Sequence, residues 1–169
     1  MDALPPWVAS DYPGGMRILF VCTGNICRSP TAEGVMRAKL AAARLDHVVD
    51  SAGTEGFHVG EPPHPPTIRA AAARGYDLAP LRARRLERPD FRRFDLLLAM
   101  DRGHLARMRR LSAAGPGRIG LFLDQAPGLE GQDVPDPYYG EAADYEHVLD
   151  QVEAGCDALV AALQERRIG

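Results

Sequence analysis

The sequence predicts an α/β fold in which a parallel sheet is covered by helices on both faces. Four apolar runs of four to six residues alternate along the chain with longer segments that have helical periodicity. The first of these runs is flanked by glycine on both sides, which is typical of a strand buried on both faces. Right-handed crossovers would join such strands, so a ligand site is expected outside their carboxyl ends.

The first half of the chain supplies two strands and two helices. Residues 17–22, RILFVC, form the first apolar run, and apolar positions at helical spacing follow over residues 30–44. Residues 48–52, VVDSA, are the second expected strand. A loop rich in glycine and proline reaches Pro66 and leads to an alanine-rich helix, which Gly75 can end in a left-handed cap.

The second half repeats the alternation. Residues 95–100, DLLLAM, are expected to form a third strand, with a helix over residues 102–111 behind it. Residues 119–123 give the fourth strand. After a long loop over residues 124–140, the periodicity of residues 141–167 predicts a final helix.

Length and composition are compatible with one folded domain. The chain has 169 residues, of which 46% are hydrophobic and 25% charged, as is usual for a globular protein. We expect a single domain over residues 16–169. Residues 1–15, MDALPPWVASDYPGG, are rich in proline and glycine and lack periodicity, so we expect them to form a flexible extension.

Charge and cysteine content restrict the location and the partners. The formal net charge is −3, and the three cysteines show no paired metal-ligand spacing, which suits a reducing compartment. No signal peptide or membrane span is evident, so we expect a cytoplasmic protein that binds neither membranes nor nucleic acid. One segment is rich in arginine and is either a solvated face or an electrostatic guide for anionic substrates: Arg82, Arg84, Arg85, Arg88, Arg92 and Arg93.

The loop after the first strand, VCTGNICRSP, has the features of an anion site. Gly24 permits a tight turn, and Asn25 tolerates positive φ, so successive N–H groups can point inward. Ser29 stands where a helix N-cap is expected and Pro30 where the first helical residue is expected. The positive end of the helix dipole would then face the loop.

A nucleophile and a cation border this loop. Helix N-termini and nearby cations favour thiolates, so we expect Cys22 to be a thiolate, and the planar guanidinium of Arg28 can bind two oxygens of a tetrahedral anion. No dinucleotide-binding or nucleotide P-loop glycine pattern is present here. The alternative is a buried cysteine beside a helix, with Arg28 in a surface ion pair.

An acidic loop, DVPDPYYG at residues 133–140, can supply the proton donor that cleavage of a phosphate ester requires. Asp136 lies between Pro135 and Pro137, which restrict its backbone and let its carboxyl be aimed. A thiolate and a phosphate dianion nearby would favour its protonated form, which predicts a bell-shaped pH profile with an acidic optimum. Asp133 is the alternative general acid.

The order VCTGNICRSP then DPYYG, together with DSAGT at residues 50–54 and HVG at 58–60, resembles the low-molecular-weight protein tyrosine phosphatases from about Met16 to the last helix. The resemblance implies a doubly wound four-stranded parallel sheet, a flavodoxin-like three-layer sandwich. It also implies metal-free hydrolysis of phosphotyrosine monoesters in proteins, through a phosphocysteine on Cys22 and without a cofactor. Asp136 would protonate the phenol and then activate water.

The resemblance implies roles for further residues. Inorganic phosphate or another oxyanion would bind at Arg28 and a phosphate-binding set made of Thr23, Gly24, Asn25, Ile26, Cys27 and Ser29. In that set Asn25 would hold the loop's shape, Ser29 would hydrogen-bond the thiolate, and Ser51 would brace Asn25. Phe57, Tyr138 and Tyr139 would flank the substrate ring, although the two tyrosines could instead be core residues.

Three positions bear on specificity and regulation. Phe57 stands where the family usually has Trp or Tyr, which keeps the stacking surface but removes a polar edge. Ile26 favours phosphotyrosine, because relatives that hydrolyse phosphoarginine typically have threonine there. By the same resemblance Cys27 could form a reversible disulfide with Cys22; packing is the alternative.

Two other functions fit the sequence less well. A thiol-coupled arsenate reductase would need resolving cysteines between residues 60 and 130, but none occurs there, and Cys156 is expected in the core of the last helix. A phosphate-binding module could dispense with Cys22 and Asp136, and both are present. The five histidines lack ligand spacing, so no metal site is expected.

Overall fold

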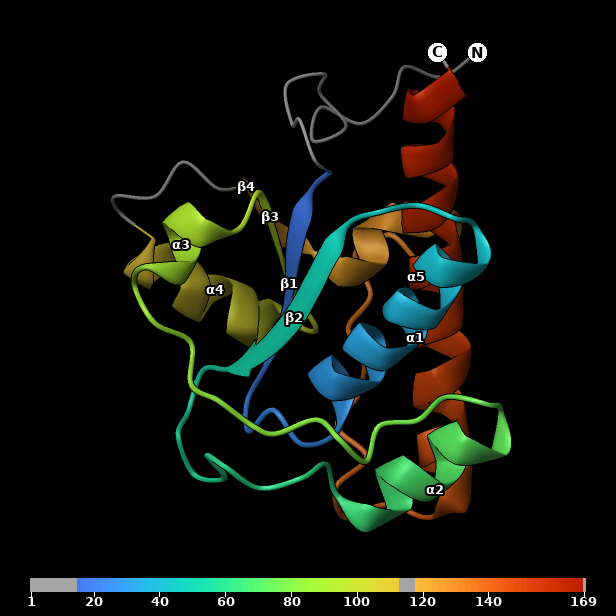
Figure 1. The fold of residues 1–169 in the computed structure, drawn as a ribbon. Coiled ribbons are helices and arrows are strands. Elements are labelled where there is room, and N and C mark those ends of the chain that lie inside the picture. The colour runs from blue at the N-terminus through green and yellow to red at the C-terminus, as the bar shows by residue number, and fades with distance from the viewer. Residues whose placement is uncertain (1–14, 113–117, 169) are drawn as a thin grey trace.

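The sheet has the predicted parallel, doubly wound topology (Figure 1). The computed structural model describes residues 15–112 and 118–168, so the predicted extension lies outside the described residues except for Gly15. The strand order is β2-β1-β3-β4, and all neighbours are parallel. The strands are β1 (Arg17–Cys22), β2 (Val48–Gly53), β3 (Leu96–Ala99) and β4 (Arg118–Leu121).

Strand β1 places the candidate nucleophile at the switch point of the sheet. Every residue of β1 after Arg17 is buried, as predicted for a central strand. Its last residue, Cys22, pairs with Gly53 of β2, and Val21 pairs with Ala99 of β3. Because the chain passes from β1 to one neighbour and then returns to the other, the loop after Cys22 opens where the winding reverses.

Helices cover both faces of the sheet (Figure 1). They are α1 (Arg28–Ala42), α2 (Pro65–Ala73), α3 (Asp90–Arg93), α4 (Arg102–Leu111) and α5 (Ala142–Ile168). Helices α1 and α5 pack on one face with Ile18 and Phe20, and α3 and α4 pack on the other with Leu19 and Val21. Helix α2 packs against α5.

The start of α1 differs from the prediction. The helix begins at Arg28, so Ser29 lies inside its first turn, and the prediction that Ser29 caps the helix is wrong. Pro30 is correspondingly the third helical residue, where a missing N–H still costs no intrahelical hydrogen bond. The Ser29 hydroxyl faces Cys22 instead, at 2.9 Å from Sγ.

Other boundaries agree more closely. Gly75 has φ 89° and donates its N–H to Ala72 O at 3.0 Å, which confirms the left-handed cap after α2. Strand β4 ends at Leu121, two residues before the predicted end, and a 3-10 turn over Phe122–Gln125 follows. The short helix α3 was not predicted, since four residues carry no usable periodicity.

Replacing Gly155 by alanine should destabilise the fold. A Cβ there would come closer than 3.0 Å to three atoms of the Phe122 ring, which is fully buried and packs edge-on against Phe20. Alanine adds about 1 kcal/mol of helix propensity, but overpacking typically costs about 1–3 kcal/mol. We expect urea unfolding to show a net loss of about 1 kcal/mol.

The exposed Ala161 on the same helix supplies the calibration. The change Ala161→Gly should cost about 1 kcal/mol through propensity alone. A Gly155→Ala variant more stable than the wild type would show that the Phe122 ring moves aside, and it would contradict the packing described above.

Candidate active site

The loop between β1 and α1 forms a concave backbone. Asn25 has φ 58°, the left-handed conformation that the sequence suggested for it. The carbonyl oxygens of Cys22 and Ile26 accept backbone hydrogen bonds from other loops at 2.8 Å each. Because the N–H of a trans peptide points opposite to its C=O, the N–H groups of Thr23 and Cys27 point to the other side, toward the pocket.

The Asn25 side chain holds this loop from behind. Its Nδ2 donates to Ser29 Oγ at 2.8 Å and to Ser51 Oγ at 2.9 Å, and its Oδ1 accepts the Arg84 N–H at 3.0 Å. The Ser51 hydroxyl then donates to Glu33 Oε1 at 2.6 Å. Burial raises the pKa of Glu33, and the hydrogen bond from Ser51 opposes that rise. The loop's shape therefore depends on a network outside the pocket.

Cys22 lies on the floor of the pocket, with 3% of its surface exposed. Its Sγ is 2.9 Å from Ser29 Oγ. Since Ser29 Oγ already accepts a hydrogen from Asn25, its own proton is available to the sulfur. A hydroxyl that donates to sulfur stabilises negative charge there.

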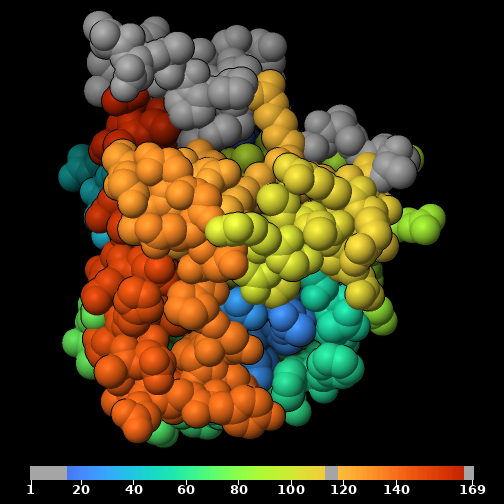
Figure 2. Space-filling view, turned by 180° about the vertical axis from the view of Figure 1, so that it is seen from behind, coloured from blue at the N-terminus to red at the C-terminus, as the bar shows by residue number. Residues whose placement is uncertain are grey.

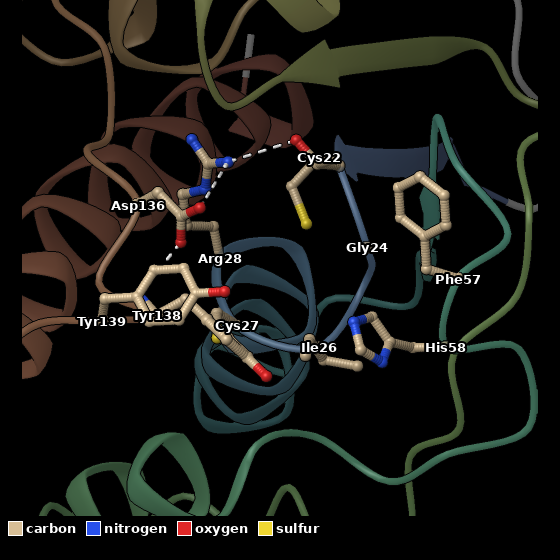
Figure 3. A pocket seen from close by; sticks show the side chains of 11 residues that line it. Cys22, Gly24, Ile26, Cys27, Arg28, Phe57, His58, Asp136, Tyr138 and Tyr139 are labelled. Carbon is tan, nitrogen blue, oxygen red and sulfur yellow. Dashed lines mark hydrogen bonds and ion pairs between the residues drawn. The ribbon is translucent and has the colours of Figure 1, made fainter.

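Arg28 is fixed at one end and faces the pocket at the other (Figure 3). Its Nη1 donates to Asp101 Oδ2 at 2.8 Å and to Val134 O at 3.0 Å. Its Nη2 lies 3.5 Å from Thr23 Oγ1 and 4.0 Å from Asp136 Oδ2. The side chain is 5% exposed, so the alternative of a surface ion pair is wrong.

Two residues beside Arg28 escaped the sequence analysis. Asp101 caps α4 by accepting the His104 N–H at 2.9 Å, and it also binds Arg28. Burial alone would raise the pKa of Asp101, but the hydrogen bond from His104 and the charge of Arg28 bring it below its usual value. The available signal was the place of Asp101 after a strand's carboxyl end, at a helix N-cap.

Asp136 overhangs the pocket from the loop before α5 (Figure 3). Its side chain is 57% exposed, and Oδ1 accepts the Tyr138 N–H at 3.1 Å. Val134 ties this loop to the sheet, because its N–H donates to the carbonyl oxygen of Met100, directly after β3, at 2.8 Å. The alternative acid, Asp133, binds the Arg102 N–H at 3.0 Å and does not line the pocket.

Aromatic side chains form the walls of the pocket, whose volume is about 350 Å³. Phe57 and His58 stand on one side, and Tyr138 and Tyr139 stand on the other (Figure 3). Phe57 is 74% exposed and Tyr139 is 96% exposed, so the core alternative for Tyr139 is wrong. In Figure 2 the blue atoms of the first loop lie in a hollow bordered by orange, yellow and teal segments.

The structure gathers most of the residues selected from sequence around one pocket. Those that line it are Cys22, Thr23, Gly24, Ile26, Cys27, Arg28, Phe57, Asp136, Tyr138 and Tyr139. Asn25, Ser29 and Ser51 lie behind the loop, in the network described above. His58 was missed; its ring would lie 3.0 Å from a Cβ on Gly24, so the ring packs closely over the loop at this glycine.

The cysteines are free thiols. Burial raises the pKa of Cys27 to about 12, and Cys27 packs with Ile26 and Ala83. Cys156 lies in the core, as expected, and burial raises its pKa. The disulfide between Cys22 and Cys27 stays a prediction.

The arginine-rich segment has a partly structural role. Arg84 binds Asp50 and the buried Asp90, both at 3.0 Å, and so ties the segment to β2 and α3. Arg85 and Arg88 are exposed, which fits a solvated face.

Within residues 15–112 and 118–168, no group of three or more His, Cys, Asp or Glu side chains is placed to hold a metal ion. In the same part of the chain, none of the helices has the length and apolar character needed to cross a membrane.

The arrangement can bind a tetrahedral oxyanion and attack its central atom. Loop amides and Arg28 Nη2 supply hydrogen-bond donors, and the Cys22 sulfur lies beneath them. Asp136 lies at the rim of the pocket, 4.0 Å from Arg28 Nη2, where it could protonate a leaving oxygen. The aromatic walls leave room above the anion for a flat ring.

Known proteins share both the sequence and the fold. The family model for low molecular weight phosphotyrosine protein phosphatase matches residues 17–168. A low molecular weight protein-tyrosine-phosphatase of Streptomyces coelicolor is 45% identical over 156 residues, covering 89% of this chain and 94% of the relative.

Solved structures extend the comparison. A protein tyrosine phosphatase of Entamoeba histolytica, crystallised with Hepes in the active site, is 33% identical, with a TM-score of 0.84 over 90% of this chain and 99% of that one. A Drosophila arginine phosphatase is 27% identical, with a TM-score of 0.81 over 86% of this chain and 96% of that one.

Proposed function

The chain belongs to the low-molecular-weight phosphotyrosine protein phosphatase family, and we propose that it hydrolyses phosphotyrosine in proteins through a phosphocysteine on Cys22, without a metal ion. One observation carries the proposal: the Cys22 sulfur, hydrogen-bonded to Ser29, lies on the floor of a pocket that Arg28 and Asp136 border. These groups match the nucleophile, the oxyanion-binding group and the proton donor that ester cleavage requires.

In the first step the Cys22 thiolate attacks phosphorus, and the bond from phosphorus to the tyrosine oxygen breaks. Asp136 gives its proton to that oxygen, so the product leaves as neutral tyrosine. In the second step Asp136 takes a proton from water, and the resulting oxygen attacks phosphorus. The S–P bond breaks, which releases inorganic phosphate and restores the thiolate.

Arg28 and the loop amides stabilise the negative charge of the transferring phosphoryl group. Nη1 is committed to Asp101 and Val134, so Nη2 is the guanidinium nitrogen that faces the pocket. The two hydrogen bonds at Nη1 restrain the planar guanidinium in this orientation. The preorganised donors take the place of a metal ion as the source of positive charge.

The walls of the pocket favour an aryl phosphate. Phe57 and Tyr139 are highly exposed apolar surfaces on opposite sides of the opening, where a phenyl ring would pass between them. A serine phosphate would not reach past these walls and would leave them unfilled. Ile26 adds an apolar contact at the floor, which suits an aryl ester better than the polar guanidino group of phosphoarginine.

A substrate comparison tests this proposal. Initial rates on phosphotyrosine, phosphoserine and phosphoarginine peptides should favour phosphotyrosine by about 100-fold or more in kcat/KM. Only its ring fills the space between the aromatic walls. The variant Ile26→Thr should shift the ratio toward phosphoarginine. A wild type that is fastest on phosphoarginine would overturn the substrate assignment while leaving the phosphatase chemistry intact.

The location follows the same reasoning. Because Cys22 must stay reduced to act, a cytoplasmic protein with phosphotyrosine proteins as substrates fits the three free cysteines. Fractionation of cells that express the chain, with the activity recovered outside the cytoplasmic fraction, would contradict this location.

A further inference from the structure

His104 contacts three groups of the site without lining the pocket. Its Nε2 lies 2.7 Å from Thr23 Oγ1 and 3.5 Å from Arg28 Nη2, and its Nδ1 lies 3.2 Å from Asp101 Oδ1. The ring is buried and projects from α4. A buried polar ring with three polar neighbours has a defined orientation, which purely apolar packing would not require.

The chemistry of these neighbours assigns the proton of the imidazole. An arginine N–H can only donate, so Nε2, which faces Arg28, presents its lone pair. The ring proton then sits on Nδ1, toward the Asp101 carboxylate. Nδ1 makes no hydrogen bond of good geometry, so its contact with Asp101 is electrostatic.

Burial and the neighbouring Arg28 keep the ring neutral. Burial and the charge of Arg28 lower the pKa of His104 to about 4, while Asp101, Asp133 and Asp136 act in the opposite direction and do not offset that decrease. A histidine with such a lowered pKa is predominantly neutral once the pH is about one unit above that value. The Nε2 lone pair is therefore available throughout the neutral and mildly acidic range.

A neutral acceptor at this point orients Thr23. The Thr23 hydroxyl donates its proton to Nε2 at 2.7 Å, which leaves the oxygen's lone pairs for Arg28 Nη2 at 3.5 Å. If Nε2 offered no lone pair, the Thr23 proton could point at the guanidinium instead. Nη2 would then lose its acceptor on this side, and the guanidinium would be restrained by its Nη1 hydrogen bonds and by the 4.0 Å contact with Asp136 alone.

We propose that His104 is a positioning residue for the phosphatase reaction: through the Thr23 hydroxyl it holds Arg28 Nη2 toward the bound phosphoryl group. The proposal rests on the function proposed above. His104 does not touch the reacting atoms, and it passes no proton to them.

Two substitutions of His104 separate positioning from packing. In His104→Gln the side-chain oxygen can reach the place of Nε2 and accept the Thr23 proton. In His104→Asn the amide reaches only the place of Nδ1, although it is also polar and smaller than histidine. His147→Asn, at an exposed position of α5, controls for the same change outside the site.

We expect His104→Asn to lower kcat/KM on an aryl phosphate by about tenfold, and to weaken inhibition by inorganic phosphate and vanadate by a similar factor, as loss of one oriented charge-assisted donor predicts. His104→Gln should recover most of both losses. Because the ring is neutral, His104→Gln should also leave the acid limb of the pH profile in place. Thermal unfolding of each variant identifies any general loss of structure.

Thr23→Val supplies an independent test that leaves the histidine in place. It removes the hydroxyl at nearly constant volume but leaves Nε2 at 3.5 Å from Nη2, so its loss should not exceed the tenfold loss of His104→Asn. The double variant should be no worse than His104→Asn alone, since both changes break the same chain of contacts.

Three results would overturn the proposal: wild-type rates in His104→Asn, equal losses in His104→Gln and His104→Asn, or additive losses in the double variant. A wild type that releases no phosphate would instead contradict the proposed function. Calorimetric titration of inorganic phosphate into each variant measures the loss of oxyanion affinity independently of turnover.

Discussion

Replacing Cys22 by serine should abolish phosphate release, with kcat lower by about 10⁴-fold or more, as is usual when an enzyme loses its nucleophile. A serine hydroxyl keeps its proton near neutral pH, and among the described residues the side chain that contacts position 22 is a hydroxyl rather than a base. Ser29 is the nearest partner of the sulfur, and its proton already points toward that position. A serine at 22 would therefore meet a donor and no base.

Binding should survive this substitution. The loop amides and Arg28 are unchanged in Cys22→Ser, so phosphate should bind with an affinity close to that of the wild type. Cys156→Ala is the matched control, because Cys156 is buried between α5 and α1 and does not line the pocket. It should lower the melting temperature and leave kcat within about twofold. Full activity in Cys22→Ser would show that another group attacks phosphorus.

Replacing Asp136 by asparagine should lower kcat by about 10²- to 10⁴-fold, the range usual for loss of a general acid. The asparagine amide fills the same place but cannot protonate the leaving oxygen. The loss should be largest for phosphotyrosine and smaller for p-nitrophenyl phosphate, whose anion leaves without help.

Asp133 offers a close control for this experiment. It lies three residues before Asp136 in the same loop, but its carboxylate binds the Arg102 N–H and stays outside the pocket. Asp133→Asn should leave kcat within about threefold, because it changes charge at a distance only. Equal losses in the two variants, or a greater loss in Asp133→Asn, would move the role of general acid away from Asp136.

Local sequence was sufficient for the parts of the fold and the site that are continuous in the chain. The run from Arg17 to Cys22 was enough to predict the strand, and the following Gly-Asn turn was enough to predict the loop. Each depends on neighbours within a few residues. The cap at Gly75 is equally local. The two motifs placed Cys22 and Asp136 correctly at one pocket because the carboxyl ends of parallel strands meet at one edge.

Features that depend on contacts between distant segments escaped prediction. Helix α3 has only four residues, and its first carboxylate, Asp90, binds Arg84 from outside the helix. Asp101 and His104 reach Arg28 because β3 lies next to β1, an adjacency that neither helix periodicity nor capping reveals. The N-cap role predicted for Ser29 was wrong for a related reason: its hydroxyl contacts the Cys22 sulfur, as the resemblance implied, and Asn25 rather than the helix terminus.

The most direct test is a search for phosphate on the protein during turnover. Wild-type protein mixed with an aryl phosphate, stopped within one turnover and digested for mass spectrometry should carry a single phosphoryl group on Cys22. That group should disappear once the substrate is consumed, and it should be absent from Cys22→Ser. Steady release of phosphate with no phosphoryl group on the protein, or with the group on another residue, would contradict the account.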